Sequence, residues 1–221
     1  MTSFQLLFTL VGTASVQTLA MVFASTFFSL LLGFPLGILL CVSDPSTGIS
    51  PKPILFKVLT RIVNVLRSFP FIILMILIFP LSRIIIGTSI GTTATIIPLS
   101  IAAAPFVARI IETALKEVDP GLVQAARAIG STKMQIIFKV LIPEALPALV
   151  AGITLTIINI IGYSAMAGAI GGGGLGDLAI RYGYQRFRTD IMIASVLVIL
   201  VFVELIQLIG TRLSNRLLKK R

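Results

Sequence analysis

The sequence predicts an all-α integral membrane protein with five transmembrane helices. Of its 221 residues, 57% are hydrophobic and 12% are charged, and the mean hydropathy is +1.07. A soluble domain is about a quarter charged, so this composition excludes a water-soluble enzyme. A helix needs about 20 apolar residues to cross a hydrocarbon core about 30 Å thick. Five windows meet this requirement: 18–42, 62–81, 92–108, 145–170 and 191–209.

A turn and a helix break shape the first two windows. Residues 18–42 carry no charge, and Asp44 opens the turn-rich stretch that ends them. The second window is broken between Arg67 and Pro70, because proline does not continue a regular helix. Two roles stay open for Arg67: its side chain snorkels to the cytoplasmic end of the span, or it forms with Ser68 and Pro70 a break that lines a path.

The other three windows differ in composition. Window 92–108 is the shortest, and its two prolines predict a kinked or tilted helix. Window 145–170 is rich in Gly, Ala, Thr and Ser, which let membrane helices approach closely. Window 191–209 contains Glu204, for which we expect a partner on another helix. A proton relay is not expected, because the sequence has no histidine.

The basic residues predict the orientation of the chain. With five spans, the side of the N-terminus holds four Lys and Arg residues and the other side holds thirteen, while Arg67 lies within a span. Basic loops resist translocation, so the N-terminus is expected outside and the C-terminus in the cytoplasm. The first Lys or Arg is Lys52, so a cleavable signal peptide with a basic start is not expected. We interpret residues 1–221 as a single transmembrane domain.

Composition also excludes several kinds of site. The net charge of +10 lies between apolar runs rather than on a solvated face, so no nucleic-acid partner is expected. With no histidine and one cysteine, Cys41, the chain is expected to have no catalytic residue and no metal site. The glycine-rich run 169–176 lacks the Gly-Lys-Ser/Thr ending of a phosphate-binding loop. It predicts a close backbone turn or a flexible surface outside the membrane.

The longest cytoplasmic connection, 109–144, carries signals for two short helices. Asp119, followed by proline, is typical of a helix start, and Gly130 is typical of a helix end. Thr132, followed three residues later by glutamine, predicts a capping box that starts a second helix. We expect that helix to continue to Pro143. Small, apolar and basic residues on this helix pair need a partner that covers them.

This connection resembles a signature of ABC importer permeases. The family pattern is Glu-Ala-Ala, then Gly, then Ile-x-Leu-Pro, and the sequence keeps the spacing with three changes of identity, including the loss of the carboxylate at Gln124. In that family the loop forms coupling helices that dock on the ATP-binding subunit. The resemblance therefore implies ATPase-coupling residues, which are Gln124, Ala125, Ala126, Gly130 and Pro143.

Further segments resemble the permeases of methionine importers, and the resemblance covers nearly the whole chain. They are 65–74, 87–91, 104–109 and 162–168. The resemblance implies a type I ABC importer permease in the bacterial cytoplasmic membrane. It implies a homodimer with two cytoplasmic ATP-binding subunits and an external substrate-binding lipoprotein. The substrates would be D- and L-methionine and related compounds. ATP and magnesium would be used by the partner subunit, and no cofactor would be bound by this chain.

Four residues of the fourth span are candidates for a gate or substrate path: Asn159, Tyr163, Ser164 and Met166. Asn159, Tyr163 and Met166 share one helical face through their spacing i, i+4 and i+7. The resemblance places this stretch near the family's translocation path. Packing is the simpler role for a methionine in a membrane helix. Our hypothesis is that Met166, opposite its symmetry mate, contributes a soft gate.

Other functions compete with a methionine permease. A permease for another amino acid or a small peptide is one, because a few pore residues do not encode the substrate. An ion-coupled secondary transporter is a second, but it calls for paired carboxylates or an inverted repeat, and Glu204 stands alone. A membrane anchor for a cytoplasmic complex is a third. It needs no polar path, whereas polar residues do lie within the spans: Asn64, Asn159, Ser164 and Gln207.

Overall fold

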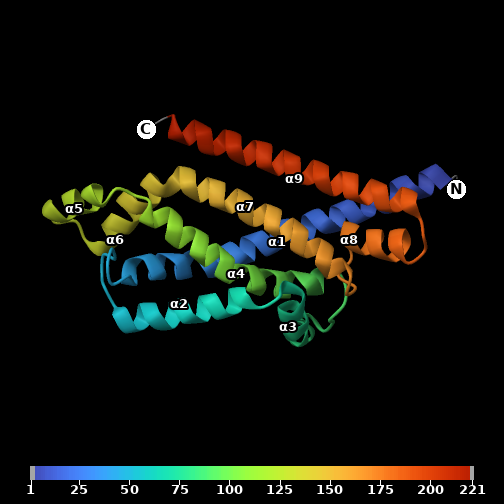
Figure 1. Ribbon diagram of the computed structural model, residues 1–221, viewed down its shortest axis with the longest axis horizontal. Coiled ribbons are helices and arrows are strands. Elements are labelled where there is room, and N and C mark those ends of the chain that lie inside the picture. The colour runs from blue at the N-terminus through green and yellow to red at the C-terminus, as the bar shows by residue number, and fades with distance from the viewer. Residues whose placement is uncertain (1–2, 220–221) are drawn as a thin grey trace.

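The computed structural model describes residues 3–219, which are mostly helical and contain no strand (Figure 1). The elements are α1 Ser3–Ser43, α2 Pro53–Ser68, α3 Phe71–Ile86, α4 Thr92–Lys116, α5 Pro120–Ala128, α6 Lys133–Ile136, the π-helical segment η1 Ile137–Leu141, α7 Ile142–Gly168, α8 Gly174–Leu178, the π-helical segment η2 Ala179–Tyr184 and α9 Thr189–Leu218. Among the described residues, four helical segments are long and apolar enough to cross a membrane, and the bent pair of α2 and α3 brings the number to five if it is counted as one span. The all-helical membrane fold is confirmed, with four to five candidate spans.

The long helices run along the long axis of the molecule, which separates two ends (Figure 1). The connection between α1 and α2 lies at one end together with α5, α6 and the end of α9. The start of α1 and α8 lie at the opposite end. The connections assigned to the basic side by sequence therefore lie together in space.

Two glycines let α1 and α4 approach closely. A Cβ atom on Gly33 would lie 2.7 Å from the Cβ of Val107, and one on Gly37 would lie 2.6 Å from the Cβ of Ile111. Both distances are shorter than real contacts between side chains, so only glycine fits at these positions. The spacing of four residues places both glycines on one helical face, as in the GxxxG pattern of membrane helix pairs.

The second window does not form one straight helix. α2 and α3 meet at an angle of 105° across the break that the sequence predicted. Phe69 ends α2 in an extended conformation (φ −69°, ψ 136°), and Pro70 precedes the first residue of α3. Proline disfavours the helical region for the residue before it, which explains why the helix stops at this point.

The helices extend beyond the other windows. α1 begins fifteen residues before its window, α4 continues to Lys116 and α9 continues to Leu218. A hydropathy window ends where charged residues begin, whereas a helix continues into water when it still has packing partners. α4 runs without interruption through Pro98 and Pro105, both of which are buried.

The glycine-rich run forms a packed corner. Gly171, Gly173 and Gly174 have φ values between +78° and +86°, a region that L side chains rarely adopt. The amide of Gly174 donates to Oε1 of Gln17 at 2.9 Å, and the next amide donates to Oγ1 of Thr18 at 2.8 Å. The run is therefore a close turn anchored on α1, which agrees with the turn interpretation and not with a flexible surface.

Candidate functional site

We call α5 and α6 the coupling helices, after the role that the family resemblance implies for them. The first of them, α5, has the ends that the sequence predicted. Oδ1 of Asp119 accepts a hydrogen bond from the amide of Gly121 at 2.8 Å. At the other end Gly130 has a φ of +80°. The amide of Gly130 donates to the carbonyl of Arg127 and the amide of Ser131 donates to the carbonyl of Ala126, both at 3.0 Å. This pair of bonds is a Schellman motif, which fixes the direction in which the chain leaves α5.

The second coupling helix, α6, begins with a complete capping box. The amide of Gln135 donates to Oγ1 of Thr132 at 3.3 Å, and the amide of Thr132 donates to Oε1 of Gln135 at 2.8 Å. The two residues thereby satisfy each other's free amides. Sequence and structure agree on where this helix begins.

The expected helix end at Pro143 is wrong. Helical structure continues through Pro143, so that α6, η1 and α7 form one segment, Lys133–Gly168. The π-helical turn at 137–141 explains this continuation. There the amide of Ile142 donates to the carbonyl of Ile137, five residues back. A π-turn shifts the hydrogen-bond pattern just before a residue that has no amide, which accommodates the proline ring.

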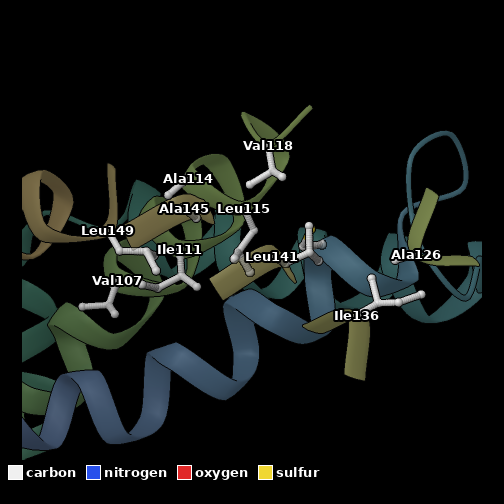
Figure 2. Close-up of a cluster of buried hydrophobic side chains, with 11 residues drawn as sticks. Val107, Ile111, Ala114, Leu115, Val118, Ala126, Ile136, Leu141, Ala145 and Leu149 are labelled. Carbon is white, nitrogen blue, oxygen red and sulfur yellow. The ribbon is translucent and has the colours of Figure 1, made fainter. Parts of the chain in front are cut away.

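A buried apolar cluster anchors the coupling helices on the spans (Figure 2). It joins residues of α4 and α7 with Leu141 of η1 and, at its far end, with Ala126 of α5 and Ile136 of α6. Ile136 is 1% exposed and Ala126 is 7% exposed. Ala126 therefore faces the protein core, and the coupling helices are a packed extension of the spans.

Other side chains of the coupling helices are exposed. Gln124 and Ala125 lie on the surface of α5. Ile129 is 84% exposed, Met134 62% and Phe138 56%. We call these five residues the docking surface. Large exposed apolar side chains next to polar ones are typical of a protein interaction site.

Side chains of both coupling helices donate hydrogen bonds to the connection after α1. Nη2 of Arg127 donates to the carbonyl of Ile49 at 3.1 Å, and Nζ of Lys133 donates to Oγ of Ser50 at 2.9 Å. The end of α1 is thereby linked to both coupling helices. The sequence analysis did not find these contacts, because they join residues about 80 positions apart.

A chain of charged side chains lies beside this corner. Glu112 is 2% exposed and accepts hydrogen bonds from Arg109 at 2.6 Å and Lys116 at 2.7 Å. Lys116 also pairs with Asp44, and Arg109 donates to Asn64 at 2.8 Å. The network joins α1, α2 and α4. The spacing of its three members on α4, at i, i+3 and i+7, was a signal that the sequence analysis missed.

Asp44 is held in its charged form. Burial alone would raise the pKa of Asp44, but hydrogen bonds from Lys116, from the hydroxyl and amide of Ser46 and from the amide of Thr47 hold it well below its usual range. A carboxylate with several donors keeps its charge at neutral pH. The network is therefore fully ionised at Asp44 in the cell.

The residues proposed for a gate lie partly together on α7. Met166 is 50% exposed and Asn159 is half-buried on the same open stripe. Tyr163 is also half-buried, and its ring stacks on Phe71 with centroids 3.9 Å apart. Ser164 does not lie on this stripe: it is 2% exposed and donates to the carbonyl of Ile161 in its own helix.

Arg67 and Glu204, the two charges within predicted spans, have different surroundings. Arg67 is exposed at the end of α2, beside hollows that also contain Phe106 and Tyr163. This placement is compatible with both roles predicted for Arg67, snorkelling and the lining of a path. Glu204 is exposed on α9, and no other residue of the part that the structure describes pairs with it. The expected partner on another helix is therefore not found among residues 3–219, and a partner on a second copy of the chain stays a prediction.

The comparisons with known proteins decide the family. The family described as "binding-protein-dependent transport system inner membrane component" matches residues 33–220. The chain belongs to this family. It is thus a multi-pass permease of the inner membrane and has no ATP-hydrolysing role. This membership favours the importer class over a secondary transporter or a membrane anchor.

Individual relatives are similar to this chain over most of its length. The probable D-methionine transport system permease protein MetI of Vibrio cholerae is 49% identical over 204 residues, 92% of this chain and 90% of that protein. The D-methionine transport system permease protein MetI of Escherichia coli K12 is 51% identical over 152 residues, 69% of this chain and 70% of its own length. A solved inward-facing conformation of the MetNI methionine ABC transporter is 44% identical and has a TM-score of 0.93. That match covers 98% of this chain and 99% of the solved one.

Proposed function

We propose that the chain is the permease of an importer for D- and L-methionine and related compounds. Two copies of the chain form the path, two cytoplasmic subunits hydrolyse ATP with magnesium, and an external lipoprotein delivers the substrate. The N-terminus is outside and the C-terminus is in the cytoplasm. The chain itself binds no cofactor. The names of relatives at 44–53% identity support the substrate.

The continuous segment from Lys133 to Gly168 carries the mechanism. One end of this segment belongs to the docking surface, and the other carries Asn159 and Met166 on the open stripe. When the ATP-binding subunits close, they move the docking surface, and the helix transmits that motion to the stripe. Alternating access follows if the stripes of two copies face each other across a path. The exposed apolar side chains of α3, such as Ile76 and Leu77, support contact with a second copy or lipid.

Uptake tests the class and the substrate together. The chain is expressed with a candidate ATP-binding subunit and a candidate lipoprotein in a host without methionine importers, and uptake of labelled L-methionine is measured. We expect uptake only when all three components are present, sensitive to vanadate and insensitive to an uncoupler. An assembled complex that hydrolyses ATP and imports another amino acid or a peptide would contradict the substrate. Uptake that an uncoupler abolishes would contradict the class.

Gly130→Val tests the coupling role. Valine at a φ of +80° is strained, so α5 can no longer turn into α6 in the same geometry. We expect uptake to fall while ATP hydrolysis continues. The matched control is Ser131→Val, which places the same side chain one position later, where φ is not positive. Normal uptake by Gly130→Val would contradict the coupling role.

A further inference from the structure

The bend between α2 and α3 contains a crevice that the mechanism above does not use. Its volume is about 260 Å³, and its lining includes Arg67, Phe69, Phe71, Phe106 and Tyr163. We call these five residues the bend crevice. It is formed because the 105° corner turns Phe71 toward α7, where it stacks on Tyr163. The crevice therefore adjoins the open stripe of α7.

Arg67 is the charged group available to a ligand at this place. Nearby Arg109 is already engaged by Glu112 and Asn64. By contrast, no side chain among residues 3–219 pairs with Arg67. The same side chain also lines the adjoining hollow of about 260 Å³ between α4 and α7. An unpaired guanidinium within a membrane segment is costly, and an anion that reaches it offsets this cost.

The chemistry of the crevice fits one class of ligand. A guanidinium binds a carboxylate through two parallel hydrogen bonds, and it does so more strongly away from bulk water. The other four members are aromatic, which suits an apolar side chain. The volume corresponds to roughly nine water-sized groups, about the number of non-hydrogen atoms in methionine. A second positive charge on the ligand would be repelled by Arg67.

We propose that the bend crevice is a transient binding site for an amino acid in transit, with Arg67 on its carboxylate and the aromatic rings on its apolar side chain. The site rests on the proposed function, because it needs a permease that carries such a substrate. It assigns Arg67 to ligand binding rather than to snorkelling. It also predicts that the carboxylate matters as much as the side chain for passage through the membrane.

Photolabelling of the complete transporter tests this site. The transporter is reconstituted in nanodiscs, exposed to the diazirine analogue of L-methionine and irradiated, and adducts on this chain are mapped by mass spectrometry. We expect adducts near Phe71 and Tyr163 that excess L-methionine prevents. Methioninol, which lacks the carboxylate, should compete about tenfold to hundredfold less well, the loss expected for hydrogen bonds to a charged group.

Variants of α2 separate the binding role from general effects of charge. Arg67→Gln should weaken labelling by a similar factor, and Arg67→Lys should keep part of it. Arg61→Gln is the matched control, because it removes a positive charge from the same exposed helix outside the crevice and should leave labelling unchanged. If Arg67→Gln does not assemble, the proposal is tested by how well methioninol competes with the diazirine analogue for labelling of the unaltered chain.

Several results would overturn the site. One is labelling of Arg67→Gln equal to that of the unaltered chain, and another is competition by methioninol equal to that by L-methionine. A third is adducts only at other segments of this chain. The last is labelling that free methionine does not prevent, which is the result expected if a lipid headgroup occupies the crevice. Methionine uptake by the unaltered transporter, measured in parallel, keeps the two proposals apart. Normal uptake without labelling of the crevice overturns the site alone, whereas no uptake and no labelling overturn both.

Discussion

Replacing Glu112 by glutamine should loosen the end of the protein that carries the coupling helices. Glu112 is 2% exposed and lies between Arg109 and Lys116. Removing one partner of a fully buried ion pair costs about 3–5 kcal/mol, because the remaining charge is left uncompensated. The side chains of Arg109 and Lys116 are 25% and 30% exposed, so water screens them in part. We therefore expect a loss of about 2–3 kcal/mol.

The single cysteine provides the assay. Cys41 is 7% exposed and belongs to the apolar cluster beside this network, so a thiol-reactive dye reaches it only when this region opens. In a chain of this length, 1 kcal/mol shifts the midpoint of thermal unfolding by about 2–4 °C. In Glu112→Gln, Cys41 should therefore be labelled at a temperature about 4–12 °C lower than in the unaltered chain. The assembled transporter is labelled, its subunits are separated on a gel, and the dye fluorescence is measured in the band of this chain.

The control for this prediction is Glu117→Gln. Glu117 is exposed on the next turn, and no ion pair to it occurs within the described residues. An exposed substitution of this kind changes stability by about 0.5 kcal/mol or less, so labelling should stay near the unaltered midpoint. If Glu112→Gln labels Cys41 at the same temperature as the control, the network does not hold this end together and the reasoning is refuted.

Three further outcomes follow from the same structure. Gly37→Val should prevent the close approach of α1 and α4 and lower the amount of assembled protein in membranes, whereas Gly12→Val, with open space around it, should not. Because the pKa of Asp44 is lower in the folded state, its ionised carboxylate stabilises the fold fully above the unfolded pKa of about 3.9, and this stabilisation is lost as the pH falls through the folded pKa. The difference in unfolding midpoint between the unaltered chain and Asp44→Asn should therefore stay constant from about pH 5 to 8 and shrink in stronger acid. Met166→Ala should alter basal hydrolysis, substrate stimulation or leak in liposomes; if all three stay unchanged, the gate hypothesis is wrong.

Local signals in the sequence predicted the coupling helices closely. Asp119, Gly130 and Thr132 act through hydrogen bonds and dihedral angles within a few residues of themselves, so their effect depends little on the rest of the fold. The break at Pro70 was predictable for the same reason. Its angle was not, because the angle depends on where Phe71 finds a packing partner.

Contacts between distant segments were not predictable in this way. The continuation through Pro143 depends on a π-turn that packing of Ile136 and Leu141 helps to hold, and a proline normally indicates a helix end. Likewise, the contact of Gly33 and Gly37 with α4 becomes visible only in the three-dimensional arrangement of α1 and α4. Ser164 was grouped with Tyr163 by proximity in sequence, although adjacent positions on a helix face different directions.

In the proposed mechanism, force transmission through this chain depends on how the end that carries the coupling helices is held together. The segment from Lys133 to Gly168 is roughly 54 Å long at about 1.5 Å per residue, enough to carry motion from the docking surface across the membrane. A lone helix would bend at η1, where the regular hydrogen-bond pattern is interrupted. The apolar cluster around η1 packs it against α4, and the network of Glu112 fixes α4 to α1 and α2. Under the proposed mechanism, we therefore expect motion at the docking surface to move α1, α2, α4 and α7 together, and the bend at Pro70 with them.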